Sequence, residues 1–357
     1  MKEKVLVAMS GGVDSTVSVR VLQQRGYEVA GATMNLLPGS EERVEKTAAL
    51  AGKLGIDFFV FDLREAFERE IIDAFARSYA VGLTPNPCVL CNRLFKFGRL
   101  LDLARERGFS KIATGHYARI SEDENGFMRL SRSSDTAKDQ SYFLFNLNQE
   151  IMRHAVFPLE GMKKEQVRAI AAGLGLENAA QKDSQDICFV PDGNYMNVID
   201  RYYAKNGLAR AEGVFVDTEG RVLGKNPGIE RYTIGQRKGV GMALGGEKPL
   251  YVIDKDPAKN AVVMGDDSLL FKETLTVANV NFTAPDRQKA ADGKTVRLLC
   301  KTRSAQRFLP VSVEYDGAGN EIFARFDTPV RAVTPGQFAV FYDGDEVVCG
   351  GEIISGK

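Results

Sequence analysis

The chain has 357 residues, and its 44% hydrophobic and 26% charged residues are ordinary for a folded globular protein of two or three domains. Lys plus Arg and Asp plus Glu both number 47, which excludes a global positive field, so any contact with RNA must come from local basic patches. Five cysteines and the lack of an apolar run of about 18 residues favour a cytoplasmic protein without a membrane span.

Short apolar runs alternate with longer amphipathic segments over the first half of the chain. The predicted strands cover residues 4–8, 28–34, 57–62 and 111–114. The predicted helices cover residues 15–25, 41–54, 65–81, 94–107 and 162–174. This alternation predicts an α/β domain, which is a parallel sheet with helices on both faces. Ligands of such sheets bind at the carboxyl ends of the strands.

The pattern changes after about residue 205, where short strand-like runs replace helical periods. These runs cover residues 213–216, 250–253, 261–264, 296–299, 309–313 and 339–342, with turn residues between them. We therefore expect three domains: a catalytic α/β domain over residues 1–204, a small β-rich domain over 205–272 and a β-barrel over 273–357.

The run SGGVDS, residues 10–15, lies where the first strand turns into the first helix. Glycines let a backbone approach a phosphate, and a helix N-terminus offers free N–H groups. No lysine follows, so this is not the G-x-x-x-x-G-K-[ST] phosphate loop. Two glycines alone more often form only a tight corner, but the serines and the aspartate have no evident packing role there.

SGGVDS resembles the pyrophosphate loop of the adenylating ATP pyrophosphatases, which let a substrate oxygen attack the α-phosphate of ATP. The resemblance implies ATP and Mg²⁺ as cofactors. It places the nucleotide on Ala8, Met9, Ser10, Gly11, Gly12, Val13, Asp14, Ser15, Met34 and Gly115.

A pair of cysteines, Cys88 and Cys91, stands in TPNPCVLCNR. A structural zinc site needs about four ligands, and the rest of the chain offers only scattered cysteines and two histidines. A redox pair requires a helix start directly after a strand, and Cys91 satisfies only the helix start. Cys300 and Cys349 stand in apolar β segments and are expected to be buried, whereas Cys188 stands in the polar run 182–189.

Eight segments, in order along the chain, are similar to the tRNA-specific 2-thiouridylases of the MnmA type. They are residues 84–101, 113–120, 138–144, 157–168, 182–189, 232–241, 301–306 and 334–342. The resemblance extends from residue 5 to about 355. It implies ATP-dependent replacement of the 2-oxygen of the wobble uridine by sulfur, in tRNAs for Lys, Glu and Gln.

The resemblance also implies roles for individual residues. Cys188 matches the cysteine that carries a persulfide, supplied by a cysteine desulfurase or a relay protein. Cys91 matches the partner thiol, expected as a low-pKa thiolate at a helix N-terminus that attacks the persulfide or forms a disulfide with Cys188. The tRNA contacts are expected at Asn86, Pro87, Cys88, His116, Lys138, Asp139, Gln140, Arg303, Ser304 and Gln337.

Three departures from the family keep alternatives open. Cys88 stands where many members have Asp, so Cys88, Cys91 and Cys188 form an alternative ligand set for a 4Fe–4S cluster. Asn226 stands where many members have His, and the segment 35–40 is short. The remaining alternatives are another adenylating ligase with a pyrophosphate loop, and a non-catalytic RNA-binding paralogue.

Overall fold

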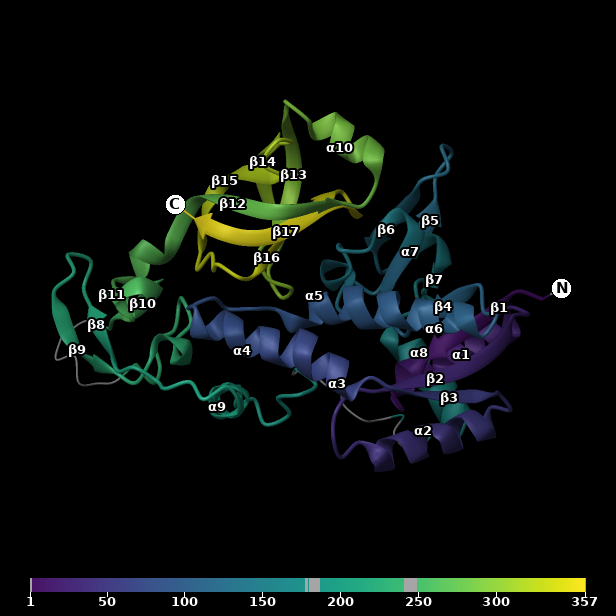
Figure 1. Cartoon of the computed structure of the whole chain (residues 1–357). Coiled ribbons are helices and arrows are strands. Elements are labelled where there is room, and N and C mark those ends of the chain that lie inside the picture. Colours follow the sequence, from purple (N-terminus) through teal and green to yellow (C-terminus); the bar gives the residue numbers. More distant parts are fainter. Residues whose placement is uncertain (1, 177–178, 180–186, 241–248, 357) are drawn as a thin grey trace.

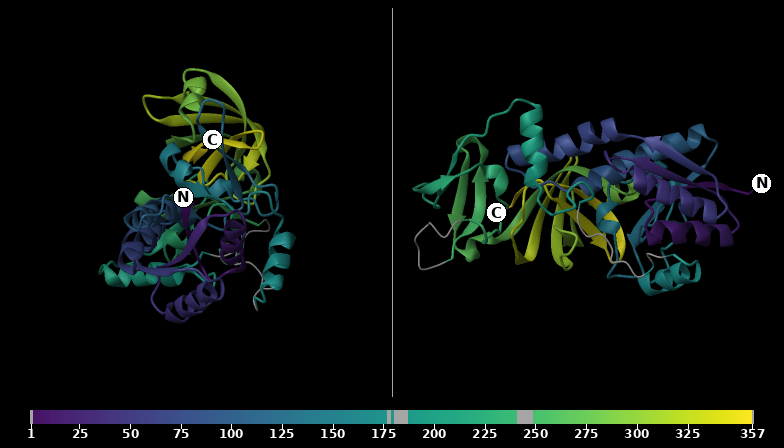
Figure 2. Two further views of the ribbon diagram at one scale, coloured as in Figure 1. Left: turned by 90° about the vertical axis from the view of Figure 1, so that its right-hand side faces the viewer. Right: turned by 90° about the horizontal axis from the view of Figure 1, so that it is seen from below.

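The structure is a computed structural model that describes residues 2–176, 179, 187–240 and 249–356. It is an elongated molecule with three sheets (Figure 1). The α/β domain lies at one end, a small β domain lies at the other, and the barrel lies between and above them (Figures 1 and 2). This architecture confirms the predicted fold class.

The first sheet has five parallel strands in the order β3-β2-β1-β4-β7. The strands are β1 (Lys4–Ala8), β2 (Glu28–Asn35), β3 (Phe58–Asp62), β4 (Lys111–Ala113) and β7 (Ala155–Val156). Val5, Leu6 and Val7 are fully buried, because β1 is central and helices cover both of its faces. Since β1 pairs with β2 on one side and with β4 on the other, its carboxyl end is the switch point where such sheets bind ligands.

Helices that flank this sheet carry the residues of interest. They are α1 (Val13–Gln24), α2 (Glu41–Lys53), α7 (Gln149–His154) and α8 (Lys164–Gly173). A further helical stretch comprises α3 (Arg64–Phe67), the π-helical segment η1 (Glu68–Ile72) and α4 (Asp73–Ala80). It corresponds to the single helix predicted over 65–81.

A second composite helix contains both cysteines of the CxxC pair. It comprises α5 (Pro87–Cys91), the π-helical segment η2 (Asn92–Arg99) and α6 (Leu100–Glu106). The predicted start at residue 94 is wrong, because the helix begins seven positions earlier, at Pro87. Proline suits the first helical position, where its missing N–H has no intrahelical partner to lose. Cys88 therefore lies in the first turn, and Cys91 lies further inside the helix.

A hairpin of the first half of the chain joins the barrel sheet. Its strands are β5 (Ala118–Glu122) and β6 (Met128–Arg132), and β6 pairs with the barrel strand β17 (Glu346–Gly356). Arg129 of β6 lies within 2.6 Å of Asp123 in the hairpin and within 2.7 Å of Asp286 in the C-terminal region. This hairpin, which the sequence patterns did not indicate, fixes the barrel against the α/β domain.

The small β domain is a four-stranded sheet in the order β10-β11-β8-β9. The strands are β8 (Gly213–Val216), β9 (Val222–Asn226), β10 (Tyr251–Asp256) and β11 (Ala261–Gly265). Its core is formed by Phe215, Val252, Val262 and Met264. The helix α9 (Met196–Lys205) precedes it and packs against α4.

Six antiparallel strands form the C-terminal barrel, which closes through pairing of β12 with β17. Besides β17, its strands are β12 (Phe271–Phe282), β13 (Thr295–Lys301), β14 (Leu309–Asp316), β15 (Glu321–Arg331) and β16 (Phe338–Asp343). The helix α10 (Pro285–Ala291) lies between β12 and β13 in the chain. Cys300 and Cys349 are buried in its core, as expected. Among the described residues, no helix has the length and apolar character needed to cross a bilayer.

Candidate functional site

The predicted phosphate loop follows β1 directly and leads into α1. Gly11 has a φ of +80°, and a Cβ there would lie 2.8 Å from Thr47 Oγ1, so only glycine fits. The backbone N–H of Ser10 donates to Ser15 Oγ at 3.2 Å, and Ser15 Oγ donates to the Gly12 carbonyl at 3.0 Å. The serines thus hold the turn in shape at the N-terminus of a helix, the position that favours an anion.

Asp14, in the first turn of α1, is held by two side chains from distant parts of the chain. Lys164 Nζ, at the start of α8, donates to both carboxylate oxygens of Asp14 at 2.8 Å. The hydroxyl of Tyr117 donates to Asp14 Oδ1 at 2.9 Å. The side chain of Lys164 is 8% exposed, so its charge is neutralised mainly by this carboxylate. The loop therefore presents a neutral ion pair beside the phosphate position.

Two predicted nucleotide contacts lie against this loop. Gly115 follows β4, and a Cβ there would lie 3.0 Å from atoms of Asp14 and Ser15. Met34 lies near the carboxyl end of β2. These positions confine the space next to the loop from β2 and β4, the two strands that flank β1.

A cavity of about 550 Å³ joins the phosphate loop to the cysteines. It is large enough for a nucleotide-sized ligand. The predicted residues that line it are Ala8, Met9, Ser10, Gly12, Val13, Asp14, Ser15, Met34, Pro87, Cys88, Cys91, Gly115, His116, Lys138, Gln140 and Cys188. One cavity thus contains both the expected site of adenylation and the thiols.

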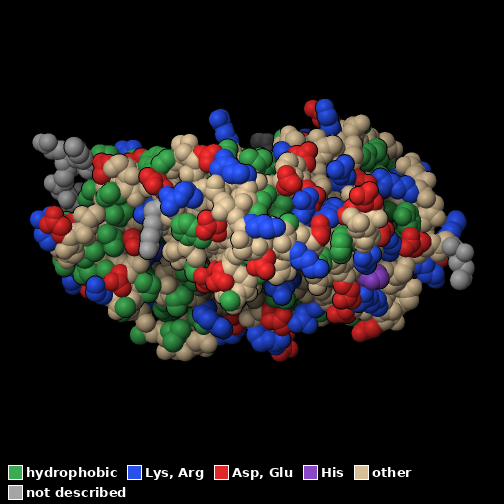
Figure 3. Space-filling view, turned by 90° about the horizontal axis from the view of Figure 1, so that it is seen from above, with side chains coloured by type: hydrophobic (Ala, Val, Ile, Leu, Met, Phe, Trp, Pro, Cys, Tyr) green, Lys and Arg blue, Asp and Glu red, His purple; other side chains and the backbone are tan. Residues whose placement is uncertain are grey.

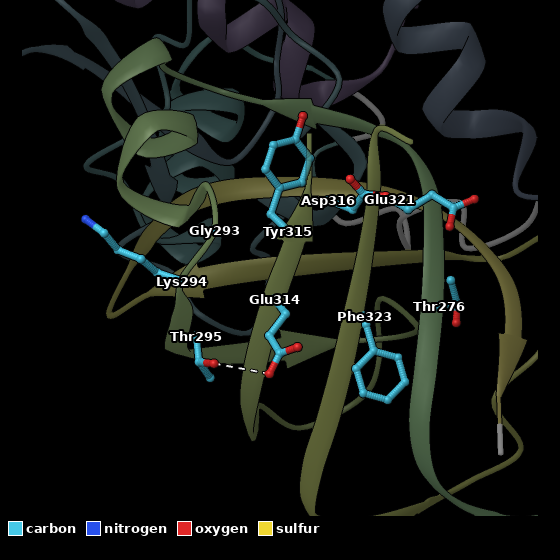
Figure 4. A pocket seen from close by; sticks show the side chains of 9 residues that line it. All are labelled: Thr276, Gly293, Lys294, Thr295, Glu314, Tyr315, Asp316, Glu321 and Phe323. Atoms are coloured by element: carbon cyan, nitrogen blue, oxygen red, sulfur yellow. Dashed lines mark hydrogen bonds between the residues drawn. The ribbon is translucent and has the colours of Figure 1, made fainter. Parts of the chain in front are cut away.

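A second hollow, of about 530 Å³, lies on the outside of the barrel (Figure 4). Glu314, Asp316 and Glu321 line it, and Thr295 donates to Glu314 Oε1 at 3.1 Å. It contains no residue of the predicted site and no helix N-terminus. Its carboxylates would repel a phosphate or an RNA backbone, so the cavity beside the phosphate loop is the candidate active site.

The thiols of this cavity are more basic than expected. Burial raises the pKa of Cys91 to about 11, and it also raises the pKa of Cys88 and of Cys188. The expectation of a low-pKa thiolate is therefore wrong for this state, because Cys91 is buried and lies beyond the first turn of its helix. All five cysteines are described and are free thiols, so the expected disulfide between Cys91 and Cys188 is not formed here.

The charge of Lys96 acts in the opposite direction on all three thiols. It lowers the pKa of Cys88, Cys91 and Cys188, and Arg43 adds to this effect at Cys188. Cys188 is exposed at the cavity, whereas Cys91 is buried. Residues 182–186 of the polar run before Cys188 lie outside the described residues.

A 4Fe–4S cluster held by Cys88, Cys91 and Cys188 is the alternative use of these thiols. Within the described ranges, which include Cys88, Cys91 and Cys188, no three His, Cys, Asp or Glu side chains converge on one point as metal ligands. The cluster and separate roles for the thiols both stay predictions.

His116 is buried at the wall of the cavity. Its Nδ1 lies 2.8 Å from Thr114 Oγ1, and its ring packs near those of Phe97 and Phe157. Burial holds its pKa well below 6.5, and the positive charge of Lys96 lowers it further. The imidazole is therefore neutral at neutral pH and is suited to donate or accept a hydrogen bond.

Two of the expected tRNA contacts in the α/β domain hold local structure. The carboxylate of Asp139 is 4% exposed and accepts from the hydroxyl of Ser141 at 2.9 Å. Gln140 Oε1 accepts from the backbone N–H of Tyr117 at 3.0 Å. Asn86 is half-buried and immediately precedes the helix that contains the cysteines.

The expected tRNA contacts in the barrel lie outside the cavity. Gln337 Nε2 donates to the carbonyl of Thr84 at 2.9 Å, so the barrel holds the segment that leads into α5. Arg303 is exposed, and its guanidinium donates to Thr334 Oγ1 at 2.8 Å. Ser304, beside it, is also exposed. On the face shown in Figure 3, Lys and Arg side chains are interspersed with Asp and Glu side chains.

Several residues of the site were not predicted as such. Lys164 and Tyr117 stand in segments that resemble the family, but their contacts with Asp14 join positions 150 and 103 residues apart. Lys96 and Arg43 were likewise missed, although both line the cavity. Only the fold brings these charges together. Asn226, the departure from a family His, is buried, and its Oδ1 accepts from the backbone N–H of Gly228 at 2.8 Å.

Three family models match consecutive parts of the chain. One described as a tRNA methyl transferase HUP domain matches residues 3–192. A tRNA methyl transferase PRC-barrel domain matches residues 201–266, and an aminomethyltransferase beta-barrel domain matches residues 272–353. These matches follow the order of the three sheets.

Full-length relatives carry a more specific description. The chain is 43% identical to the tRNA-specific 2-thiouridylase MnmA of Acetivibrio thermocellus over 366 residues, which cover 99% of each chain. It is 44% identical to that of Treponema denticola, covering 99% of this chain and 98% of the relative. It is 43% identical to that of Acidithiobacillus ferrooxidans, covering 98% of each.

Proposed function

The chain belongs to the family of tRNA-specific 2-thiouridylases, and we propose that it uses ATP and Mg²⁺ to replace the 2-oxygen of the wobble uridine with sulfur, in tRNAs for Lys, Glu and Gln. The observation that carries this proposal is the single cavity lined by the phosphate loop, Cys91 and Cys188. Adenylation and sulfur transfer on one base require both sets of groups within reach of the same atom.

The first half of the reaction activates the base. The phosphate loop and the N-terminus of α1 would hold the phosphates of ATP, while Met34 and Gly115 bracket the adenosine. The 2-oxygen of the uridine then attacks the α-phosphate and pyrophosphate leaves, so a poor leaving group becomes AMP. Asp14, the only carboxylate among the described residues that line the cavity, fits Mg²⁺ together with phosphate oxygens. Bound there, the ion would neutralise the charge of the departing pyrophosphate.

The second half of the reaction transfers sulfur. A cysteine desulfurase or a relay protein would load Cys188, which is exposed and accessible to a protein donor. The Cys91 thiolate attacks the inner sulfur of the persulfide, a disulfide between Cys91 and Cys188 forms, and the outer sulfur leaves with the electron pair as hydrosulfide. Hydrosulfide attacks C2 of the adenylated base and expels AMP. A thiol reductant from outside then reduces the disulfide for the next cycle.

The RNA must bring its base into this cavity. A base that undergoes chemistry leaves its stack, and contacts to the backbone position it. Asn86, Pro87 and Cys88 at the start of α5 are proposed to lie beside the base, with His116, Lys138, Asp139 and Gln140 around it. The barrel would contribute Arg303 and Ser304, which are exposed, and Gln337, which holds the segment before α5.

Reconstitution tests this proposal. The purified chain, ATP, unmodified tRNA, cysteine and a cysteine desulfurase are expected to give 2-thiouridine, detected by mass spectrometry of nucleosides. Cys188→Ala should abolish the product and keep tRNA binding, whereas Cys300→Ala, which removes a thiol of the barrel core, should keep both.

Other outcomes would contradict the proposal and point to a named alternative. A methylated uridine in place of a thiolated one would overturn the reaction. ATP–pyrophosphate exchange that requires a small molecule and no tRNA would indicate another adenylating ligase. Retained tRNA affinity without release of AMP would indicate a non-catalytic paralogue. Activity that depends on iron and sulfide bound to the chain would restore the cluster alternative.

A further inference from the structure

The helix that contains Cys91 changes its geometry directly after this residue. The eight residues Asn92–Arg99 form the π-helical segment η2. In an α-helix, the side chains of residues five positions apart point about 140° away from each other around the helix axis, because the helix has 3.6 residues per turn. A π-helix closes its hydrogen bonds at the fifth residue, so these residues come close to one face. The segment therefore presents Lys96 on the side of Cys91.

The sequence accommodates this unusual segment at Gly98. A Cβ at Gly98 would lie 2.9 Å from the carbonyl oxygen of Arg93, which is five residues earlier. Any larger residue would thus push the backbone away from the wide turn. π-Helical segments are rare and are frequent at functional sites, which makes their position next to a site cysteine informative.

Lys96 lines the cavity together with the three thiols. It is half-buried, and it forms no hydrogen bond or ion pair with the part of the chain that the structure describes. The carboxylate in the described cavity lining, Asp14, is already bound by Lys164. Holding an ammonium group in a cavity without a partner carboxylate is unfavourable, so the position suits an anion that forms during the reaction.

The neighbouring thiols supply such an anion. The charge of Lys96 lowers the pKa of Cys88, Cys91 and Cys188, against the larger effect of burial. The other charged or titratable groups that line the described part of the cavity are Arg43 from α2, Lys138, Lys164, Asp14, His116 and Tyr117. Of these, only Arg43 acts on a thiol, and it acts on Cys188 alone.

We propose that η2 presents Lys96 as the positioning cation for anionic sulfur in this cavity, stabilising the Cys91 thiolate and the sulfur displaced from Cys188. The stabilisation of the Cys91 thiolate by Lys96 is independent of the proposed function. The use of this thiolate in sulfur transfer rests on the proposed function. In that step, charge passes from the attacking sulfur of Cys91 to the departing hydrosulfide, and Lys96 faces both without exchanging a proton.

The test measures the thiols of the free full-length protein. Alkylation by iodoacetamide, followed by peptide mass spectrometry, gives the rate for Cys91 and Cys188 as a function of pH. Lys96→Met should move both profiles to higher pH and slow alkylation at neutral pH about tenfold, the effect of one pKa unit. Lys96→Arg should restore most of the rate. Lys138→Met, which removes another cavity cation, should leave both profiles in place.

Two outcomes would overturn the proposal. The first is a Lys96→Met profile that coincides with the wild-type profile. The second is a Gly98→Ala variant that folds and retains the wild-type profile, since this change keeps the lysine but opposes the π-helical turn. Because the assay needs neither ATP nor tRNA, a shifted profile in a protein that fails to thiolate tRNA would reject the proposed function and leave this inference standing.

Discussion

Replacing Lys164 by Met removes the cation that holds Asp14 in the phosphate loop. In the wild-type protein, Lys164 Nζ donates to both oxygens of Asp14 at 2.8 Å, and the lysine side chain is 8% exposed. In the variant, the hydroxyl of Tyr117 would remain as a hydrogen-bond donor to the carboxylate. The carboxylate of Asp14 would then lose its fixed orientation in the phosphate loop, so we expect the adenylation step to suffer.

The expected sizes of the effects on adenylation and on stability follow from these contacts. A hydrogen bond to a charged group contributes roughly 1.5–3 kcal/mol, which corresponds to a fall of about 10- to 100-fold in ATP–pyrophosphate exchange. Removing one partner of a fully buried pair costs about 3–5 kcal/mol. Asp14 is 30% exposed, so solvent screens its charge, and we expect the free energy of unfolding to fall by about 2 kcal/mol.

ATP–pyrophosphate exchange in the presence of tRNA measures the first effect, and urea denaturation measures the second. Lys164→Arg keeps the charge and should retain most of the exchange, while Tyr117→Phe removes one neutral donor and should reduce it only about fivefold. If the Lys164→Met variant exchanged pyrophosphate at the wild-type rate, and with the wild-type dependence on ATP concentration, the proposed role of this ion pair would be refuted.

Three further predictions follow from single contacts. Gly115→Ala should raise the KM for ATP at least about tenfold, measured by exchange, because its Cβ would lie 3.0 Å from Asp14 atoms. Gln337→Ala removes the donor to the Thr84 carbonyl, so it should slow 2-thiouridine formation several-fold and leave the exchange reaction near its wild-type rate. Arg129→Met should lower the free energy of unfolding by about 2 kcal/mol at neutral pH. Arg129 holds the pKa of Asp286 below 3.8, so this carboxylate contributes stability above that pH and loses it as the pH falls, and the two proteins should converge in acid denaturation.

The sequence patterns were most informative where a segment has a clear hydrophobic pattern of either a strand or a helix. The apolar run at residues 4–8 and the helical run that follows it predicted β1 and α1 closely, because β1 is buried on both faces and most of α1 is buried as well. The turn at Gly11 was also predictable, since only glycine adopts its φ beside Thr47 without a clash. The predicted domain limits and the predicted roles of individual residues stay predictions.

The helix that contains the cysteines was harder to predict. Pro87 suits either a loop or a first helical turn, and the π-helical segment shifts the register of the residues after Cys91. The expected low pKa of Cys91 failed for a related reason, since burial depends on the packing of distant helices around the thiol. The pairing of Asp14 with Lys164 depends on long-range contacts in the same way.

The hairpin β5–β6 shows a further limit of local patterns. Its strands are short and lie between elements of the α/β domain, yet they complete a sheet with β17, more than 200 residues later in the chain. The half-buried Arg129 links the two regions through Asp286 and Glu346, and nothing in its local sequence indicates these partners.

Thiolation of tRNA at the wobble uridine is the activity proposed for this chain. Nucleoside analysis of tRNA from a strain that lacks the chain tests it most directly. We predict that 2-thiouridine disappears from the tRNAs for Lys, Glu and Gln, and returns with the wild-type chain but not with Cys188→Ala. An unchanged level of 2-thiouridine in the deletion strain, or full recovery with Cys188→Ala, would contradict it.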